Sequence, residues 1–281
     1  MNYKKRSIIF FAIIFALGLC IFLSLYMYIG GGKKEIKAAK RFIDIVYSND
    51  IVDKGEDLDK ISYTSNVKSQ IATSDEYYNV TTKDFSIDVD SDYKIVGFNN
   101  NVCKLGERLI SEDEAEKLAE KYLSRIYKGE YEYKGIVDDN TEKIIPYYTL
   151  VFTKMDDGYP YYSDQIVVGI NKSTGKMDNY LNGIYQKKHK RVNVDKTVEE
   201  AKNIAINAFN NLYKDGNIIE EPYLAFCDDK DKENTQLCYV VSVSGKDEDG
   251  KDTVWKYFVS SDKGKIINNI KENVANTKAI E

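Results

Sequence analysis

The side chains best suited to acid–base or nucleophilic chemistry in this chain are a single histidine, four cysteines and many carboxylates. The histidine, His189, lies in the cationic run 187–191 (KKHKR). Hydrolysis by a serine or cysteine nucleophile normally needs a base such as histidine, and a metalloprotease of the His-Glu-x-x-His type needs two histidines. That metalloprotease type is therefore excluded. We interpret 187–191 as a solvated connector between folded units, or else as a contact for anionic wall polymer or lipid headgroups, and we predict no catalytic residue.

Three aspartates, Asp88, Asp90 and Asp92, have the spacing that opens a calcium-binding loop. An EF-hand loop would also need glycine in place of Tyr93 and glutamate in place of Asn99. We therefore interpret the segment as an acidic hairpin turn. A glycoside hydrolase needs only two carboxylates, but nothing in the surrounding sequence singles out one pair of carboxylates as catalytic. We predict no metal site and no cofactor, and we keep a carboxylate-dependent cell-wall hydrolase as an alternative function.

The cysteines do not describe a disulfide framework, because Cys103, Cys227 and Cys238 are an odd number outside the apolar N-terminal run. Cys227 and Cys238 flank a polar loop and are predicted to lie on adjacent strands. Either a disulfide between them or two reduced, half-buried thiols fits this pattern. No Cys-x-x-Cys motif occurs, so thioredoxin-like chemistry has no support.

Three tyrosines around a proline, Tyr159, Tyr161 and Tyr162, are candidates for a surface that binds a partner. Tyrosine is favoured where one side of a residue is apolar and the other is wet. The alternative is an edge strand of mixed exposure. The formal net charge of −5 disfavours a general nucleic-acid binder, which would present a basic face.

The N-terminal region predicts a membrane anchor, because Ser7–Ile29 is a run without charged residues. A helix of this length can cross a hydrocarbon layer roughly 30 Å thick. Basic residues precede the run at 4–6 and follow it at 33–41, so local charge does not decide the orientation. We expect 1–32 to comprise a cytoplasmic tail, a single span and a glycine joint, with Cys20 as a passive thiol.

The predicted helices form a repeat along the chain, and they must position the other elements. Ser111–Tyr127 has apolar residues at the spacing of an amphipathic helix, and Thr197–Tyr213, 86 residues later, matches every one of these positions. Ser111 with Glu114 and Thr197 with Glu200 form capping-box patterns. A weaker copy lies 80 residues before the first, where Glu35 replaces the first alanine.

Runs rich in Tyr, Val and Ile follow each helix and predict antiparallel strands. The last hairpin aligns in all three copies, with Lys94, Lys176 and Lys265 just after the turn. Gly175 and Gly264 supply the positive φ that such turns require, whereas Tyr93 replaces that glycine, so the first turn is expected to differ. We predict an α+β fold, with one helix on a three- to four-stranded antiparallel sheet in each of the units 33–100, 101–190 and 191–281.

A helix that begins Ser-x-x-Glu-Ala, followed by hairpins ending in a Thr-Gly-Lys turn, resembles the PepSY family. The segment Gly158–Tyr180 is also similar to the YcdB/YcdC repeat group. The resemblance covers about 101–270 and extends to 33–100 only through the internal alignment. It implies extracytoplasmic modules that bind or restrain peptidases or assist lytic enzymes of the cell wall, and it supplies no active-site residue.

From these patterns we expect a non-enzymatic, membrane-anchored extracytoplasmic protein. Its expected partner is an envelope peptidase, a cell-wall lytic enzyme or a sensor kinase, which it would contact through exposed sheet edges. Besides the hydrolase, a structural spacer of the envelope is an alternative.

Overall fold

The computed structural model describes residues 18–21, 33–55, 57–69, 76–102, 106, 109–137, 145–183, 189, 192–230 and 234–272. No helix within these ranges is both long and apolar enough to cross a bilayer. The predicted span Ser7–Ile29 lies outside the described residues except for 18–21, which are helical. Cys103 lies outside them as well.

The chain divides into two compact units. Unit 1 comprises 1–128, 135–151 and 166–184, and unit 2 comprises 129–134, 152–165 and 185–281. The boundary therefore passes through a long β-hairpin, whose distal part belongs to unit 2. Helices and mostly antiparallel strands make up both units, which confirms the predicted α+β class.

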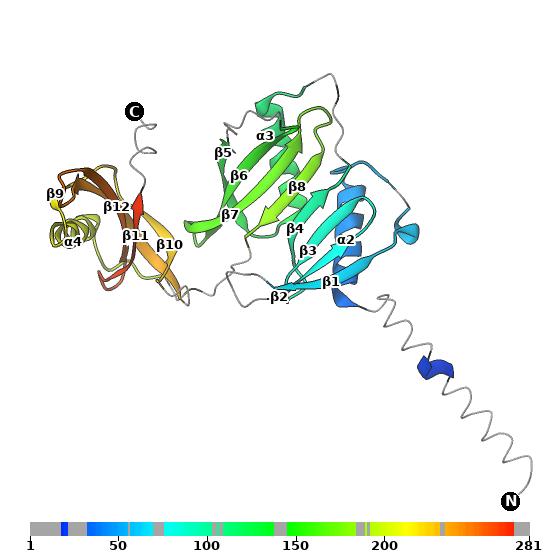
Figure 1. Cartoon of the computed structure of the whole chain (residues 1–281), viewed down its shortest axis with the longest axis horizontal. Helices are drawn as coiled ribbons and strands as arrows, with labels where there is room; N and C mark the ends of the chain where they lie inside the picture. The colour runs from blue at the N-terminus through cyan, green and yellow to red at the C-terminus, as the bar shows by residue number, and fades with distance from the viewer. Residues whose placement is uncertain are drawn as a thin grey trace, which may run out of the picture. The chain divides into compact units, whose positions relative to one another are not determined.

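Unit 1 begins with a helix and a four-stranded meander. Helix α2 (Lys34–Ser48) is followed by a 3₁₀ turn, η1 (Leu58–Lys60), and by β1 (Thr64–Ser69), β2 (Glu76–Thr81), β3 (Phe85–Val89) and β4 (Ile95–Asn100). The strands pair in chain order, each antiparallel to the next. The apolar stripe of α2 packs on β2, β3 and β4 (Figure 1).

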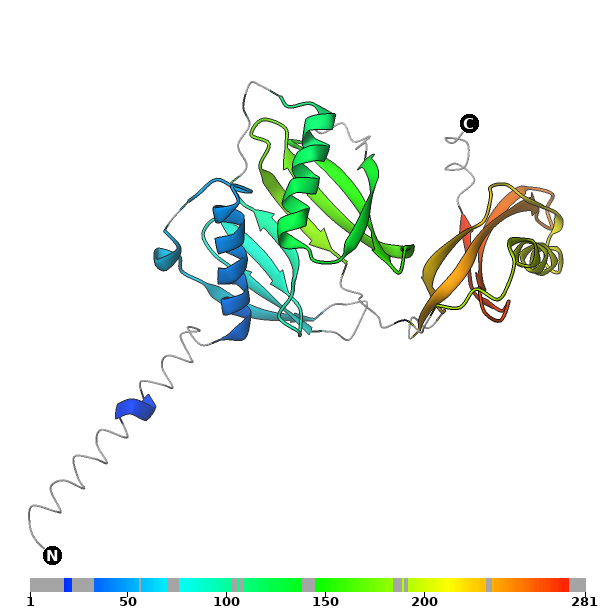
Figure 2. The ribbon, with the colours of Figure 1, turned by 180° about the vertical axis from the view of Figure 1, so that it is seen from behind.

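A second copy of this arrangement follows. It consists of α3 (Glu112–Ile126), β5 (Glu130–Val137), β6 (Tyr147–Asp156), β7 (Tyr159–Asn171) and β8 (Met177–Asn182), and these strands also pair in chain order. The last strands of the two copies, β4 and β8, pair antiparallel with Phe98 opposite Tyr180. Helices α2 and α3 consequently lie side by side on one face of a shared sheet (Figure 2).

Unit 2 contains the third copy. Helix α4 (Val198–Asn210) precedes β9 (Lys214–Ile218), β10 (Tyr223–Asp228), β11 (Thr235–Lys246), β12 (Asp252–Ser260) and β13 (Ile266–Glu272). Strands β10 to β13 pair in chain order, and β9 pairs with the other end of β11. Helix α4 packs on β9, β11 and β12, over a core that includes Val241, Tyr257 and Val259.

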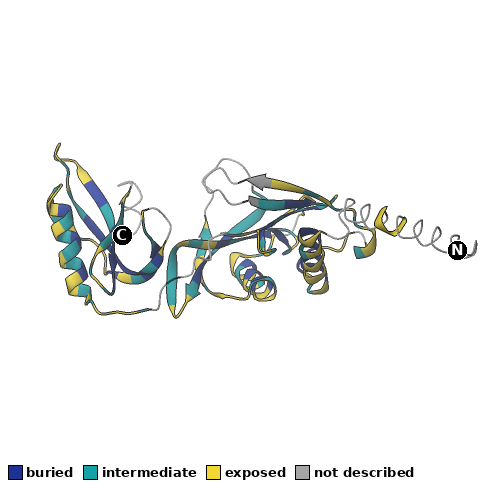
Figure 3. Ribbon diagram, turned by 90° about the horizontal axis from the view of Figure 1, so that it is seen from below, coloured by how far each residue is buried: buried dark blue, intermediate teal, exposed yellow. Residues whose placement is uncertain are grey.

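The predicted helix stripes are confirmed by burial. Ala115, Ala119 and Leu123 of α3 are fully buried, and so are their counterparts 86 residues later, Ala201, Ala205 and Phe209. The helix surfaces alternate between buried and exposed faces accordingly (Figure 3). In α2, Glu35 takes the place of the first alanine; it is buried, and its carboxylate accepts a hydrogen bond from Ser65 Oγ at 2.9 Å.

Both predicted helix caps form. The Glu114 N–H donates to Ser111 Oγ at 3.2 Å. At α4 the box is complete, because the Glu200 N–H donates to Thr197 Oγ1 and the Thr197 N–H donates to Glu200 Oε2. This last bond, with those from Lys196 and the Thr197 hydroxyl, lowers the pKa of Glu200 to about 2.

The turns of the last hairpins differ as expected. Each closes on the carbonyl of the aligned lysine, but the turn Asp90–Lys94 is one residue shorter than Asn171–Lys176 and Ser260–Lys265. Gly175 and Gly264 have φ of 68° and 66°. Tyr93 keeps the same left-handed conformation, with φ of 63° and its ring stacked on Tyr78. Tyr93 in place of glycine therefore goes with a shorter loop. Its backbone keeps a left-handed conformation, which is unfavourable in free energy for a residue other than glycine.

We predict that the Glu200 cap stabilises the protein in a pH-dependent way. Thr197→Ala is expected to reduce the free energy of unfolding by about 1 kcal/mol at neutral pH. Because the folded-state pKa of Glu200 lies below its ordinary value of 4.5, its contribution is complete above that pH and is lost as the pH falls from 4.5 toward 2. Denaturant unfolding of wild type and Glu200→Gln between pH 7 and pH 3 measures this.

The matched control is Glu114→Gln, at the same position of α3. The cap contact that the structure describes there runs from the Glu114 N–H to Ser111 Oγ and does not use the carboxylate. A difference between wild type and Glu200→Gln that is constant over this pH range would contradict the prediction.

Candidate functional site

The tip of the β6–β7 hairpin presents two adjacent carboxylates. Strand β6 ends at Asp156 and β7 begins at Tyr159, so Asp157 and Gly158 form a two-residue turn. Both have positive φ, 48° and 78°, which is the type I′ geometry that Asp-Gly favours between twisted strands. This turn fixes the Asp157 backbone and places both carboxylates at the exposed end of the hairpin.

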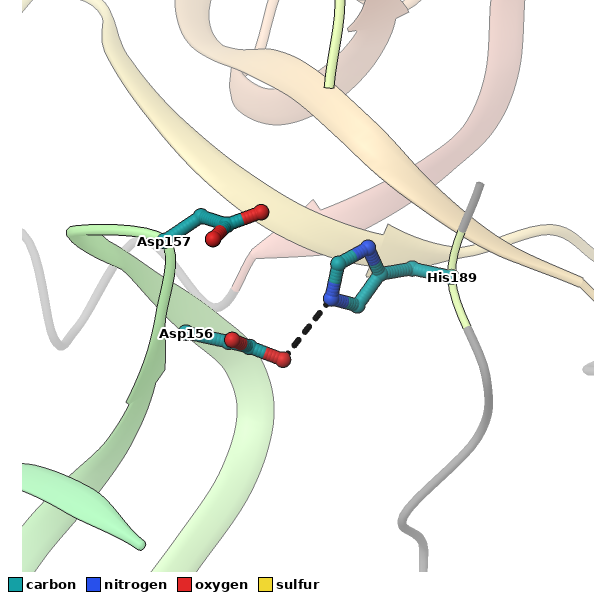
Figure 4. Close-up of side chains that lie close together, drawn as sticks. All are labelled: Asp156, Asp157 and His189. Carbon is teal, nitrogen blue, oxygen red and sulfur yellow. Dashed lines mark hydrogen bonds and ion pairs between the residues drawn. The ribbon is translucent and has the colours of Figure 1, made fainter. Parts of the chain in front are cut away.

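His189 lies against this tip within unit 2. Its backbone forms a parallel bridge with Thr235 at the start of β11. Its ring stacks on Phe226, with 4.1 Å between ring centroids, and lies 6.2 Å from the Tyr161 ring. The His189 Nε2 and Asp156 Oδ2 atoms are 2.8 Å apart and share a hydrogen bond (Figure 4). The backbone bridge and the aromatic stacking thus orient the imidazole toward the carboxylates.

The cluster is partly open to solvent. The His189 side chain is 14 % exposed, whereas that of Asp156 is 51 % exposed. The hydrogen bond from His189 lowers the pKa of Asp156, and a weaker bond donated by the Tyr161 hydroxyl at 3.3 Å acts in the same direction. Asp156 is therefore held in its ionised form.

These three residues could together hold a metal ion. Asp156, Asp157 and His189 each offer one ligand atom, and these atoms lie within 4.8 Å of one another. Sequence reasoning predicted no metal site and interpreted 187–191 as a connector or as a contact for anionic wall polymer or lipid headgroups. The missed signal is weak, since an Asp-Asp-Gly turn and a lone histidine 33 residues apart follow no ligand-spacing rule.

The candidate partner surface lies beside this cluster. Tyr159, Tyr161 and Tyr162 are all half-buried. The rings of Tyr161 and Tyr159 contact Phe226, at 5.0 and 6.3 Å, and that of Tyr162 contacts Phe258 at 4.7 Å. These tyrosines therefore pack the hairpin onto the β10–β13 layer of unit 2. That they also bind a partner remains a prediction.

Cys227 and Cys238 are free thiols, and both are buried. They lie on adjacent strands, as predicted, but Cys227 pairs with Gln236 and Cys238 pairs with Ala225. The two are diagonal neighbours in the ladder. Burial raises the pKa of Cys227, which disfavours a reactive thiolate.

The other acidic segments form turns. Asp90 Oδ1 accepts from the backbone N–H groups of Asp92 and Lys94. At the β11–β12 tip, Asp247 Oδ1 accepts from the N–H groups of Asp249 and Lys251. This second tip lines a surface pocket of unit 2 together with Leu212, Tyr213, Glu248 and Lys271.

Residues 77–183 match the family model described as "YcdB, YcdC repeated domain". Over these residues the chain is similar to that repeated domain. This confirms the resemblance predicted from Gly158–Tyr180, although the matched region begins in β2, inside the first predicted unit. It includes Asp156 and Asp157 and ends before His189, so the cluster joins the repeated domain to the segment that follows it.

Among solved structures, the chain is similar to the Bacillus megaterium YpeB C-terminal domain, with 15% sequence identity and a TM-score of 0.48. The alignment covers 82% of this chain and 95% of that one. No curated protein matches the chain.

We predict that the Asp156–His189 pair stabilises unit 2 modestly. Asp156→Asn is expected to reduce the free energy of unfolding by about 0.5 kcal/mol at neutral pH, a small effect because the carboxylate is exposed and its charge is screened by solvent. Since the folded-state pKa of Asp156 is lowered, the stabilisation is present above its ordinary value of 3.8 and fades as the pH falls below it. Denaturant unfolding of the variant and of wild type across this range is the measurement. Asp249→Asn, on the other acidic tip, is the control, and an equal loss in both variants would contradict the prediction.

Proposed function

We propose that this protein is a membrane-anchored, extracytoplasmic binding or regulatory protein. In this proposal Ser7–Ile29 is the single span, and the folded units hold an envelope peptidase, a cell-wall lytic enzyme or a sensor kinase near the membrane. The uncharged N-terminal run and the PepSY-like repeats support the proposal. The basic residues on both sides of the run leave orientation to the family resemblance, which implies a location outside the cytoplasm.

The observation that carries the proposal is an open sheet edge in unit 1. Among the described strands, β1 pairs with β2 alone. Its Val67 side chain is 58 % exposed. An edge strand of this kind presents backbone N–H and C=O groups that a partner strand can pair with, and pockets or exposed side chains beside it supply specificity.

We propose a binding role and assign no catalytic role to His189, whose Nε2 bonds to the Asp156 carboxylate. A YcdB, YcdC repeated domain is a structural repeat, and we assign no catalytic role to its residues.

We predict that a photo-crosslinking residue in place of Val67 captures an envelope enzyme or sensor kinase on intact cells, because an added strand would lie directly against β1. External protease added to the same cells is expected to degrade the folded units, since they face outward. Mass spectrometry of the cross-linked band identifies the partner.

The control places the same photoreactive residue at Asp44, on the exposed face of α2, where no cross-link is expected. Two results would count against the proposal. One is equal capture at both positions, and the other is protection of the folded units from protease until the cells are lysed.

A further inference from the structure

We propose that Asp156, Asp157 and His189 bind a divalent transition-metal ion, with zinc as the best fit. The inference stands apart from the proposed function, since it concerns the hairpin tip and not the β1 edge. Its basis is the convergence of an imidazole and two carboxylates, with ligand atoms within 4.8 Å of one another.

The ligands are held by structure outside the cluster. The type I′ turn sets Asp157 with φ of 48°, and Asp156 ends a strand, β6, that pairs with β5 and β7. The imidazole is fixed by the Thr235 bridge and by its stacking on Phe226, which is 1 % exposed. A metal therefore meets side chains whose backbones are already placed, which limits the entropy lost on binding.

The donor set selects the class of ion. Calcium prefers six to eight oxygen ligands and magnesium an octahedron of oxygens, and an imidazole suits neither. Zinc takes His nitrogen and Asp oxygen at about 2.0–2.2 Å, with four ligands in a tetrahedron. Three protein ligands leave one position for water. The four cationic residues flanking His189 in the sequence oppose any cation, so the affinity has to come from direct ligation by the imidazole.

The present hydrogen bond marks where the ion would enter. Two ligands of a tetrahedral zinc lie about 3.3 Å apart, and His189 Nε2 and Asp156 Oδ2 now lie 2.8 Å apart. Separation by about half an ångström would admit the ion. The ion replaces the proton that lies between these atoms. From an imidazolium ring that proton is released to solvent and Nδ1 keeps its own, whereas in a neutral ring it moves to Nδ1, so that a neutral imidazole ligates the ion in both cases.

Cobalt(II) is the probe that reports coordination directly. The full-length chain, purified in detergent without a polyhistidine tag, is titrated with Co²⁺ and with Zn²⁺. We expect visible d–d absorption of four- or five-coordinate cobalt, displacement of cobalt by stoichiometric zinc, and an increase in Tm with zinc. Asp157→Asn leaves the His189–Asp156 bond in place. It is expected to weaken zinc binding by at least the roughly ten-fold that loss of a mere outer-shell partner costs, because it removes the charge of a direct ligand, and His189→Gln is expected to abolish the cobalt spectrum.

Asp249→Asn, on the second acidic hairpin tip, is the matched control and is expected to bind as wild type does. Circular dichroism of each variant establishes that it is folded. Absence of zinc binding at millimolar concentration would overturn the proposal, as would binding unchanged in Asp157→Asn and His189→Gln. In either case the cluster is a hydrogen-bonded pair with a neighbouring carboxylate.

Discussion

A helix can approach a β-sheet closely only where its facing side chains are small, and this constraint organises the protein. Ala115 and Ala119 in α3, and Ala201 and Ala205 in α4, are fully buried where each helix meets its sheet. One turn further on, Leu123 and Phe209 fill the space at the end of the contact. In α2, Ala39 and Ile43 hold two of the equivalent places, while Glu35 holds the third through a hydrogen bond with Ser65. Each copy can therefore form its own core layer.

Each helix covers one face of its sheet, and the three copies differ in which strands pair with the edges of these sheets. The first two copies join through β4 and β8, which leaves β1 and β5 as outer strands, each with one partner among the described strands. In unit 2, the third copy accepts the tip of the β6–β7 hairpin, through Tyr161 opposite Phe226. One edge therefore carries the proposed partner contact, and another creates the place where Asp156 and Asp157 meet His189.

The sequence predicts the structural features that depend on residues close together along the chain. The alanine stripes, the caps at Ser111 and Thr197, and the fact that the turn at Tyr93 differs from the other two all follow from spacing within a few residues. The pairing of β4 with β8 did not follow, because nothing local records which strands of two similar sheets will meet. The His189 cluster was missed for the same reason, since a backbone bridge to Thr235 and stacking on Phe226 bring the ring there. The register of Cys227 and Cys238 likewise depends on the loop between β10 and β11.

The central physical claim is that close helix–sheet contact at the alanine positions holds each repeat together. It is tested most directly by the free energy of unfolding of Ala205→Leu, with Ala208→Leu as the control on the half-buried flank of the same helix. The larger side chain at Ala205 should force α4 away from the sheet and cost about 1–3 kcal/mol, with a smaller loss at Ala208. Equal stability of Ala205→Leu and wild type would contradict the claim.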